Sequence, residues 1–175
     1  SANSIMRETN AVLRAIKDRR SIRRYAGGSI AHDLIDAVLE AGRWAPSGLN
    51  NQPWRFAIVR DVETRAKLAA FTNYRSIIKD SSVCIAVFLH LASGYDCDKD
   101  CMGIGACVQN MLLAAHSLGL GAVWLGEILK SKDEVARLLE VPDGLELMAV
   151  IALGLPGEEP ESDRLPLDTL IVRKT

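Results

Sequence analysis

Apolar residues follow two alternating patterns along the chain, and this alternation predicts its secondary structure. Predominantly apolar runs at 54–59, 83–91, 122–125 and within 145–155 indicate strands. The run at 83–91 is so uniformly apolar that we expect it in the middle of a sheet. Apolar residues at helical spacing predict helices at 9–18, 29–42, 61–71, 101–118 and 131–139. About four strands and five helices therefore predict an α+β or α/β fold.

Residues that favour helix ends mark several boundaries of these elements. Ser29 is the predicted N-cap of the second helix, and Ser131 and Glu134 have the spacing of a capping box. Gly119 and Gly121 are expected to close the longest helix. The last segment, 165–173, is predicted to be extended and carries enough large apolar residues that we expect it to dock on another surface, such as a second subunit.

Bulk composition is that of an ordinary globular protein. The 175 residues are 49% hydrophobic and 25% charged, with a net charge of −1, so we expect one domain. The low net charge argues against binding to nucleic acid or to an anionic membrane. No apolar run approaches the length of a membrane span. Four cysteines without a recognisable secretion signal predict reduced thiols in the cytoplasm.

A dense basic segment follows the first predicted helix. The sequence RRSIRR at 19–24 places four arginines and a hydroxyl within six residues. Guanidinium groups bind phosphate oxygens through two parallel hydrogen bonds, so the segment predicts a phosphate site. The alternative is a solvated helix end, which also favours basic residues.

A loop of turn-forming residues and amides precedes the first predicted strand. It reads APSGLNNQP at 45–53 and runs directly into Trp54. Amide side chains donate and accept hydrogen bonds in one plane, which matches the edge of a pyrimidine-like ring. The alternative is a plain surface turn. Together the basic segment and the loop suggest a phosphorylated heteroaromatic cofactor.

Four blocks of the sequence, in this order and spacing, resemble the nitroreductase family of FMN-binding flavoproteins. The blocks are RRSIRRY at 19–25, APSGLNNQPWRF at 45–56, GLGAVWLG at 119–126, and GLP at 154–156 followed by RLP at 164–166. The resemblance extends from residue 10 to 172. It implies a single α+β domain over 1–175, with a mixed central sheet flanked by helices, in a homodimer with FMN at the interface. Residues 1–9 would be peripheral, and 165–175 would pack on the partner subunit.

The resemblance also implies roles at the phosphate end of the flavin. The phosphate and ribityl chain would be held by Arg19, Arg20, Ser21 and Arg164. Arg23 corresponds to a cation near flavin N1 and O2, where it would stabilise the negative charge of the reduced ring. Many family members carry a basic residue where this chain has Ser162, so phosphate binding would depend more on the N-terminal arginines.

Other positions correspond to contacts with the flavin ring. The loop that reaches the flavin of the partner subunit matches Pro46, Ser47, Gly48 and Asn50. Leu125 and Gly126 match the backbone amides beside N5 and O4, and together with Arg23 they carry the catalytic roles that the resemblance implies. Asn73 matches a polar contact at the pyrimidine edge.

The function implied by the resemblance is ping-pong oxidoreduction. NAD(P)H would be a transient electron donor, FMN the cofactor, and a nitroaromatic, quinone or similar small molecule the acceptor. Two alternatives remain open: other flavin chemistry on the same fold (flavin breakdown, dehalogenation or dehydrogenation) and a non-catalytic flavin-binding protein. Larger members insert helices near 92–100, where this chain has a short connection whose one aromatic residue, Tyr95, is either a lid or a surface residue.

The cysteines are not expected to bind a metal. Cys97, Cys101 and Cys107 lie close in sequence, but they lack the C-x-x-C spacing and a neighbouring histidine. We interpret them as thiols incidental to helix packing.

Overall fold

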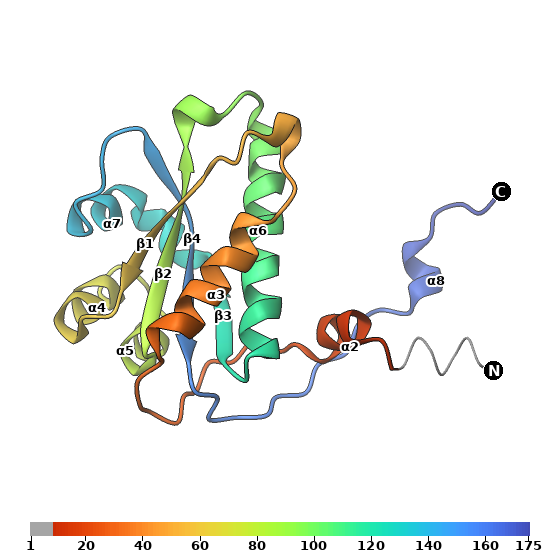
Figure 1. Ribbon diagram of the computed structural model, residues 1–175, viewed down its shortest axis with the longest axis horizontal. Coiled ribbons are helices and arrows are strands. Elements are labelled where there is room, and N and C mark those ends of the chain that lie inside the picture. Colours follow the sequence, from red (N-terminus) through yellow and green to blue (C-terminus); the bar gives the residue numbers. More distant parts are fainter. Residues whose placement is uncertain (1–8) are drawn as a thin grey trace.

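An antiparallel sheet of four strands forms the centre of the computed structural model, which describes residues 9–175 (Figure 1). The strands are β1 (Trp54–Val59), β2 (Val83–His90), β3 (Gly121–Leu125) and β4 (Leu145–Gly154), in the order β1-β2-β4-β3. Ser21 forms an isolated parallel bridge with Ala122 of β3. The predicted α+β fold is confirmed; the pairings between the four strands are all antiparallel, and the isolated bridge is parallel.

The two central strands divide their side chains between two hydrophobic cores. Along β2, Val83, Ile85 and Val87 enter one core, whereas Cys84, Ala86 and Phe88 enter the other. Because successive side chains of a strand point to opposite faces, a strand buried on both faces must be apolar at every position. The uniform run at 83–91 therefore lies in the middle of the sheet, as its sequence predicted.

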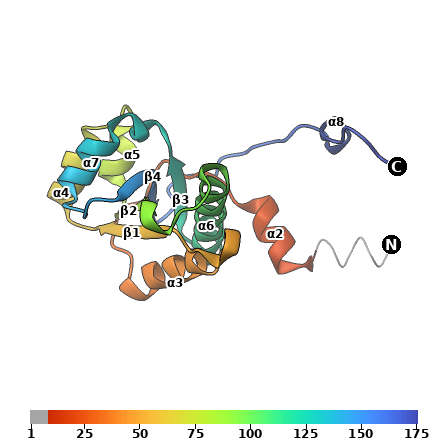
Figure 2. The same cartoon turned by 90° about the horizontal axis from the view of Figure 1, so that it is seen from above.

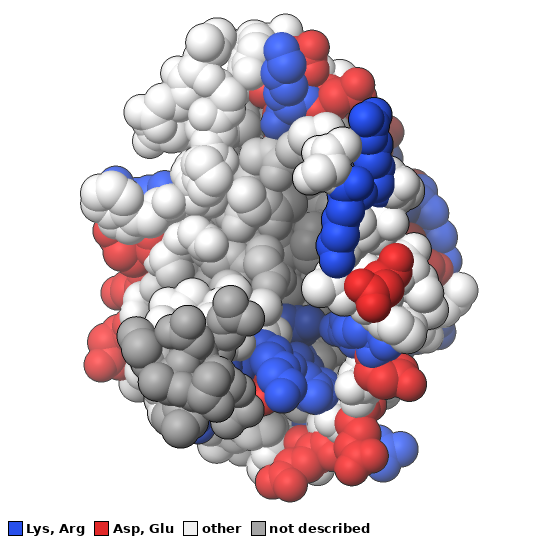
Figure 3. Space-filling model, turned by 90° about the vertical axis from the view of Figure 1, so that its right-hand side faces the viewer, with Lys and Arg blue, Asp and Glu red and all other residues white. Residues whose placement is uncertain are grey.

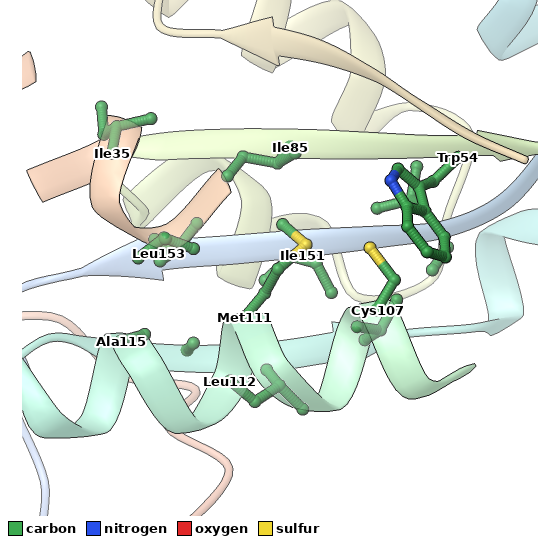
Figure 4. Close-up of a cluster of buried hydrophobic side chains, with 14 of the residues drawn as sticks. Ile35, Trp54, Ile85, Cys107, Met111, Leu112, Ala115, Ile151 and Leu153 are labelled. Atoms are coloured by element: carbon green, nitrogen blue, oxygen red, sulfur yellow. The ribbon is translucent and has the colours of Figure 1, made fainter. Parts of the chain in front are cut away.

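Helices cover both faces of the sheet (Figures 1 and 2). One face carries α3 (His32–Arg43) and α6 (Cys97–Ser117); the other carries α4 (Val62–Ala69), α5 (Arg75–Asp80) and α7 (Lys132–Leu138). Gly42 of α3 is needed for close packing on α6, because a Cβ atom there would lie 2.8 Å from Cγ of Met111. Figure 4 shows Met111 and Cys107 of α6 among the buried side chains under the sheet.

Both ends of the described chain project from this body. The helices α2 (Ala11–Asp18) and α8 (Leu167–Leu170) lie to one side of it (Figure 1), and neither contains a buried residue. The expected peripheral segment 1–9 falls, except for Thr9, outside the described residues. In residues 9–175, no helix combines the length and the apolar character that crossing a bilayer requires.

The predicted boundaries were wrong at several helix ends. The second helix begins at His32 after Ala31, rather than at Ser29. The long helix begins at Cys97 rather than 101, because the Asp96 side chain accepts a hydrogen bond from the Lys99 backbone amide. Ser131 makes no side-chain cap; the 3-10 turn η3 (Glu127–Ser131) continues directly into α7. The helices α5 and α8 were not predicted.

Candidate functional site

Basic residues from opposite ends of the chain line one cavity. This cavity, which we call the phosphate cradle, has a volume of about 200 Å³. It is lined by Arg19, Arg20, Ser21, Arg23, Pro160, Glu161, Ser162 and Arg164. The four residues predicted to hold the phosphate therefore lie together with Arg23, which was predicted to lie near N1 and O2 of the ring, although more than 130 positions separate Arg23 from Arg164.

Close backbone contacts bring these two segments together. Gly121 of β3 lies under Ile22, where a Cβ atom would be 2.7 Å from Cγ2 of the isoleucine, and the Ile22 amide donates to Ala122. Gly157 lies as close to the backbone of residues 24–26, and its amide donates to the Arg24 carbonyl at 2.9 Å. The two glycines thus fix the basic segment at the edge of the sheet and direct residues 158–164 along it.

A carboxylate adds a further link between the basic segment and the C-terminal segment. Oε1 of Glu158 accepts hydrogen bonds from the backbone amides of Arg23, at 2.7 Å, and Arg24, at 3.3 Å. The Glu158 carboxylate thus fixes the backbone of the basic segment by accepting hydrogen bonds from its amides, and not from its guanidinium groups.

Arg19 lies in an environment that favours an anion. Burial lowers the pKa of Arg19 below its usual value, and the positive charges of Arg164 and Arg20 lower it further. The buried Nε of Arg19 also has no hydrogen-bond partner in the structure. A phosphate group would neutralise the repulsion and accept the unused hydrogen bond, so these residues fit the phosphate of FMN.

Ser162 orients the C-terminal arginine of the cradle. Nη1 of Arg164 donates to Ser162 Oγ and to the Asp163 carbonyl, both at 2.6 Å. Ser162 thus supplies a hydroxyl, instead of a second cation, that holds the Arg164 side chain in this orientation.

The polar loop at 45–53 has a strained backbone. Leu49, Asn50 and Gln52 have positive φ angles of 54°, 52° and 47°, a conformation that costs on the order of 1–3 kcal/mol for each non-glycine residue. The turn is stabilised from within, because the Gln52 amide donates to Ser47 Oγ at 3.0 Å. Strain of this kind persists only where surrounding contacts impose it, and it is concentrated at functional sites.

Contacts with α6 and the connection before it impose this conformation. Asn51 Nδ2 donates to Asp100 Oδ1, at 2.8 Å, and to the Ser93 carbonyl. The buried Asp100 carboxylate also accepts the Tyr95 amide at 3.0 Å. The Tyr95 ring lies over Gly48, where a Cβ atom would be 1.8 Å from Oη. Tyr95 is 43% exposed, and its side chain packs on the polar loop at Gly48.

The end of β3 lies beside the turn that carries Asn73. Leu125 is buried in the second core, and Gly126, which follows it, is exposed. The next residue, Glu127, accepts hydrogen bonds from the Asn73 amide, at 3.1 Å, and from the Thr72 hydroxyl. Asn73 and Gly126, both predicted to contact the ring, are therefore joined through one carboxylate.

The cysteines lie in two different environments. Cys97 and Cys101 are exposed at the start of α6, whereas Cys107 faces the core (Figure 4). Burial raises the pKa of Cys107 to about 12. Cys107 thus lies apart from the two exposed cysteines, and residues 9–175 contain no group of three or more His, Cys, Asp or Glu side chains arranged for a metal ion.

Comparison with known proteins identifies the family. The family model described as "Nitroreductase family" matches residues 16–74 and 72–155. The chain belongs to the nitroreductase family. It is 39% identical, over 169 residues, to a Methanothermobacter thermautotrophicus protein assigned as an NADH dehydrogenase/NAD(P)H nitroreductase; the match covers 90% of this chain and 86% of the relative.

Two solved structures place ligands in this nitroreductase fold. A Desulfovibrio desulfuricans protein described as a nitroreductase, solved in complex with FMN, is 46% identical with a TM-score of 0.90, over 95% of this chain and 98% of that one. The Vibrio harveyi NADPH:FMN oxidoreductase, solved with NAD⁺, is 26% identical with a TM-score of 0.85, over 95% of this chain and 78% of that one.

Within this nitroreductase chain, the predicted site residues form three groups. Arg19, Arg20, Ser21, Arg23 and Arg164 line the cradle, whereas Leu125, Gly126 and Asn73 lie around Glu127. The third predicted set, Pro46, Ser47, Gly48 and Asn50, lies in the strained loop against the start of α6. Sequence reasoning missed Asp100, Glu127 and Glu158, because an isolated carboxylate has no pattern that reveals its long-range partners.

Proposed function

We propose that this chain is an NAD(P)H-dependent FMN oxidoreductase that reduces a nitroaromatic, a quinone or a similar small acceptor by a ping-pong mechanism. The observation that carries the proposal is the convergence of Arg19 and Arg164 on one cavity, with a buried Nε that has no partner. The curated relatives with NAD(P)H oxidoreductase names and the FMN-bound neighbour support it.

The residues present divide the work of binding between them. Arg19, Arg20, Ser21 and Arg164 would hold the phosphate of FMN. The guanidinium of Arg23 would lie near N1, and the backbone at Leu125 and Gly126 would lie beside N5. FMN supplies the chemistry when bound, taking a hydride from NAD(P)H and passing two electrons to the acceptor. The protein's part is to orient the ring and to stabilise negative charge on it.

We also propose that the working form is a homodimer. Large apolar side chains are exposed on the projecting α2 and at the end of α3, where Val12 is 65% and Trp44 72% exposed. A cavity of about 430 Å³ lies between α2, α3 and α6. Figure 3 shows a broad area without charged side chains on this side of the molecule, bordered below by basic ones. Exposed apolar areas of this kind mark interfaces.

The C-terminal segment also exposes large apolar side chains. Leu165, Leu167 and Leu170 are each more than half exposed, so we propose that residues 165–175 pack on the second subunit. We place the enzyme in the cytoplasm, since its four cysteines are all free thiols. We propose neither a nucleic acid nor a membrane as a partner.

The experiment is a flavin titration followed by reduction. Purified protein incubated with FMN is expected to be yellow after desalting, and its flavin absorbance should bleach when NADH or NADPH is added without oxygen. Turnover with a panel of nitroaromatics and quinones then identifies the acceptor class. A protein that stays colourless in excess FMN overturns the proposal. Tight FMN binding without bleaching would favour a non-catalytic flavin protein, and loss of the flavin during aerobic turnover would favour flavin breakdown.

A further inference from the structure

Glu127 lies between two segments that are distant in sequence. It begins η3, immediately after Gly126 at the end of β3, and its neighbour Ile128 is fully buried and fixes this turn to the second core. Facing it is the turn 72–74, between α4 and α5. The Glu127 carboxylate thus links the end of β3 to the turn that carries Asn73.

One oxygen of this carboxylate organises the turn. Oε2 of Glu127 accepts hydrogen bonds from the hydroxyl of Thr72 and, at 3.1 Å, from the backbone amide of Asn73. Thr72 is only 2% exposed, and its hydroxyl oxygen in turn accepts the Tyr74 amide at 3.2 Å. Three successive residues of the turn are therefore held, directly or through Thr72, by a single oxygen.

The other oxygen faces a lysine outside the turn. Oε1 of Glu127 pairs with Lys130, one turn further along η3. Hydrogen bonds from Lys130 and Thr72 lower the pKa of Glu127 to about 2, so the side chain is charged throughout the range in which the enzyme would operate. Its two oxygens have separate tasks, and variants can remove one without the other.

We propose that Glu127 is a positioning residue that holds Asn73 against the pyrimidine edge of the flavin and ties that edge to Gly126. This inference rests on the proposed function, because it takes FMN as the ligand. Glu127 itself need not touch the ring. Its role is to fix the backbone of Asn73 so that the amide side chain meets the ring without an ordering cost at the moment of binding.

The test compares FMN with 3-methyl-FMN, in which a methyl group replaces the hydrogen-bonding proton at the pyrimidine edge. The wild-type protein is expected to bind FMN at least about tenfold more tightly, the value of one well-placed buried hydrogen bond. In Glu127→Ala the ratio of the two dissociation constants should fall to about twofold or less, because the edge contact is then no longer held. Damage to the fold alone would weaken both ligands and leave their ratio unchanged.

Two further variants complete the experiment. Thr72→Val removes one donor to Oε2 and should give an intermediate ratio, which also serves if Glu127→Ala fails to fold. Lys130→Ala removes only the outer ion pair and should keep the wild-type ratio. A wild-type protein that binds both flavins equally, or Glu127→Ala and Thr72→Val variants that keep the full ratio, would overturn the inference. A wild-type protein that binds no flavin would instead overturn the proposed function.

Discussion

The two ends of the candidate flavin site are built on different physical principles. At the phosphate cradle, guanidinium groups are brought together against their mutual repulsion, and a buried nitrogen of Arg19 lacks a partner. At the ring end, the Asp100 and Glu127 carboxylates accept hydrogen bonds from the loop and from the turn 72–74. The buried Oδ1 of Asn51 lacks a partner there as well, and Leu49, Asn50 and Gln52 have strained backbones. The cradle holds like charges whose repulsion an anion would relieve, whereas the ring end is ordered by hydrogen bonds within the chain.

This difference predicts which ligand groups each end recognises. A cluster of like charges attracts any anion of suitable size, so the cradle gives affinity with little discrimination. A fixed arrangement of amides discriminates by shape and by the position of donors and acceptors. Substitutions at the two ends should therefore impair flavin binding in different ways. Flavins that lack the phosphate, or the hydrogen-bonding edge of the ring, can separate the two effects.

The largest expected effect is at the cradle. Arg19→Ala and Arg164→Ala should each weaken FMN binding by about tenfold to a hundredfold, because each removes charge-assisted hydrogen bonds to the phosphate. Riboflavin, which lacks the phosphate, should bind these variants about as well as it binds the wild type. Fluorescence titration of the apoprotein with both flavins measures the two constants directly.

Ser162→Ala is the matched control for this comparison. It removes the hydroxyl that orients Arg164 but no charge, so it should weaken FMN binding by less than about fivefold. If riboflavin binding falls as far as FMN binding in Arg19→Ala, the cradle does not hold the phosphate.

The next effect is at the loop. Gly48→Ala would place a methyl group 1.8 Å from the Tyr95 hydroxyl, and overpacking of this kind costs about 1–3 kcal/mol. The loop or the ring must move, so FMN and riboflavin should both bind about tenfold more weakly. The double variant Gly48→Ala/Tyr95→Ala makes room for the methyl group and should recover most of that loss. Without any recovery, the loop position would not depend on this contact.

The same variant tests whether the loop serves the partner's flavin. A heterodimer of one Arg19→Ala subunit and one Gly48→Ala subunit, isolated through two different tags, should bind about one FMN with wild-type affinity if each loop reaches the other subunit's cradle. If each loop serves its own chain, both sites carry one defect and neither recovers.

The fold could be predicted largely from the sequence because its main signal is local. The run at 83–91 alternates between two cores, and a strand buried on both faces has few other solutions. Helix ends were predicted less well. Ser29 and Ser131 have the right chemistry for caps, but α3 begins at His32 without a side-chain cap, and the 3-10 turn η3 runs directly into α7.

The candidate site divides in the same way. The arginines and the loop could be found because each forms a dense cluster in the sequence, and the family resemblance then joined clusters that no local pattern connects. The carboxylates that position them could not be found. Asp100 acts on Asn51 across 49 residues and Glu127 on Thr72 across 55, and one acidic residue among 22 gives no sign of such a partner.

The smallest expected effect is on the melting temperature of the apoprotein. The direction of the change tests whether the cradle arginines repel each other. The pKa of Arg19 is lowered in the folded chain, partly by Arg164, so the charged form that prevails at neutral pH is disfavoured by folding. Arg164→Ala should therefore raise the melting temperature of the apoprotein by about 1–2 °C, the shift expected from relieving about 0.5 kcal/mol of repulsion. Inorganic phosphate should stabilise the wild type, compared with chloride at equal ionic strength, and should do so less in the variant. A lower melting temperature for the apo variant would mean that Arg164 is held by favourable contacts and that the cradle stores no repulsion for an anion to release.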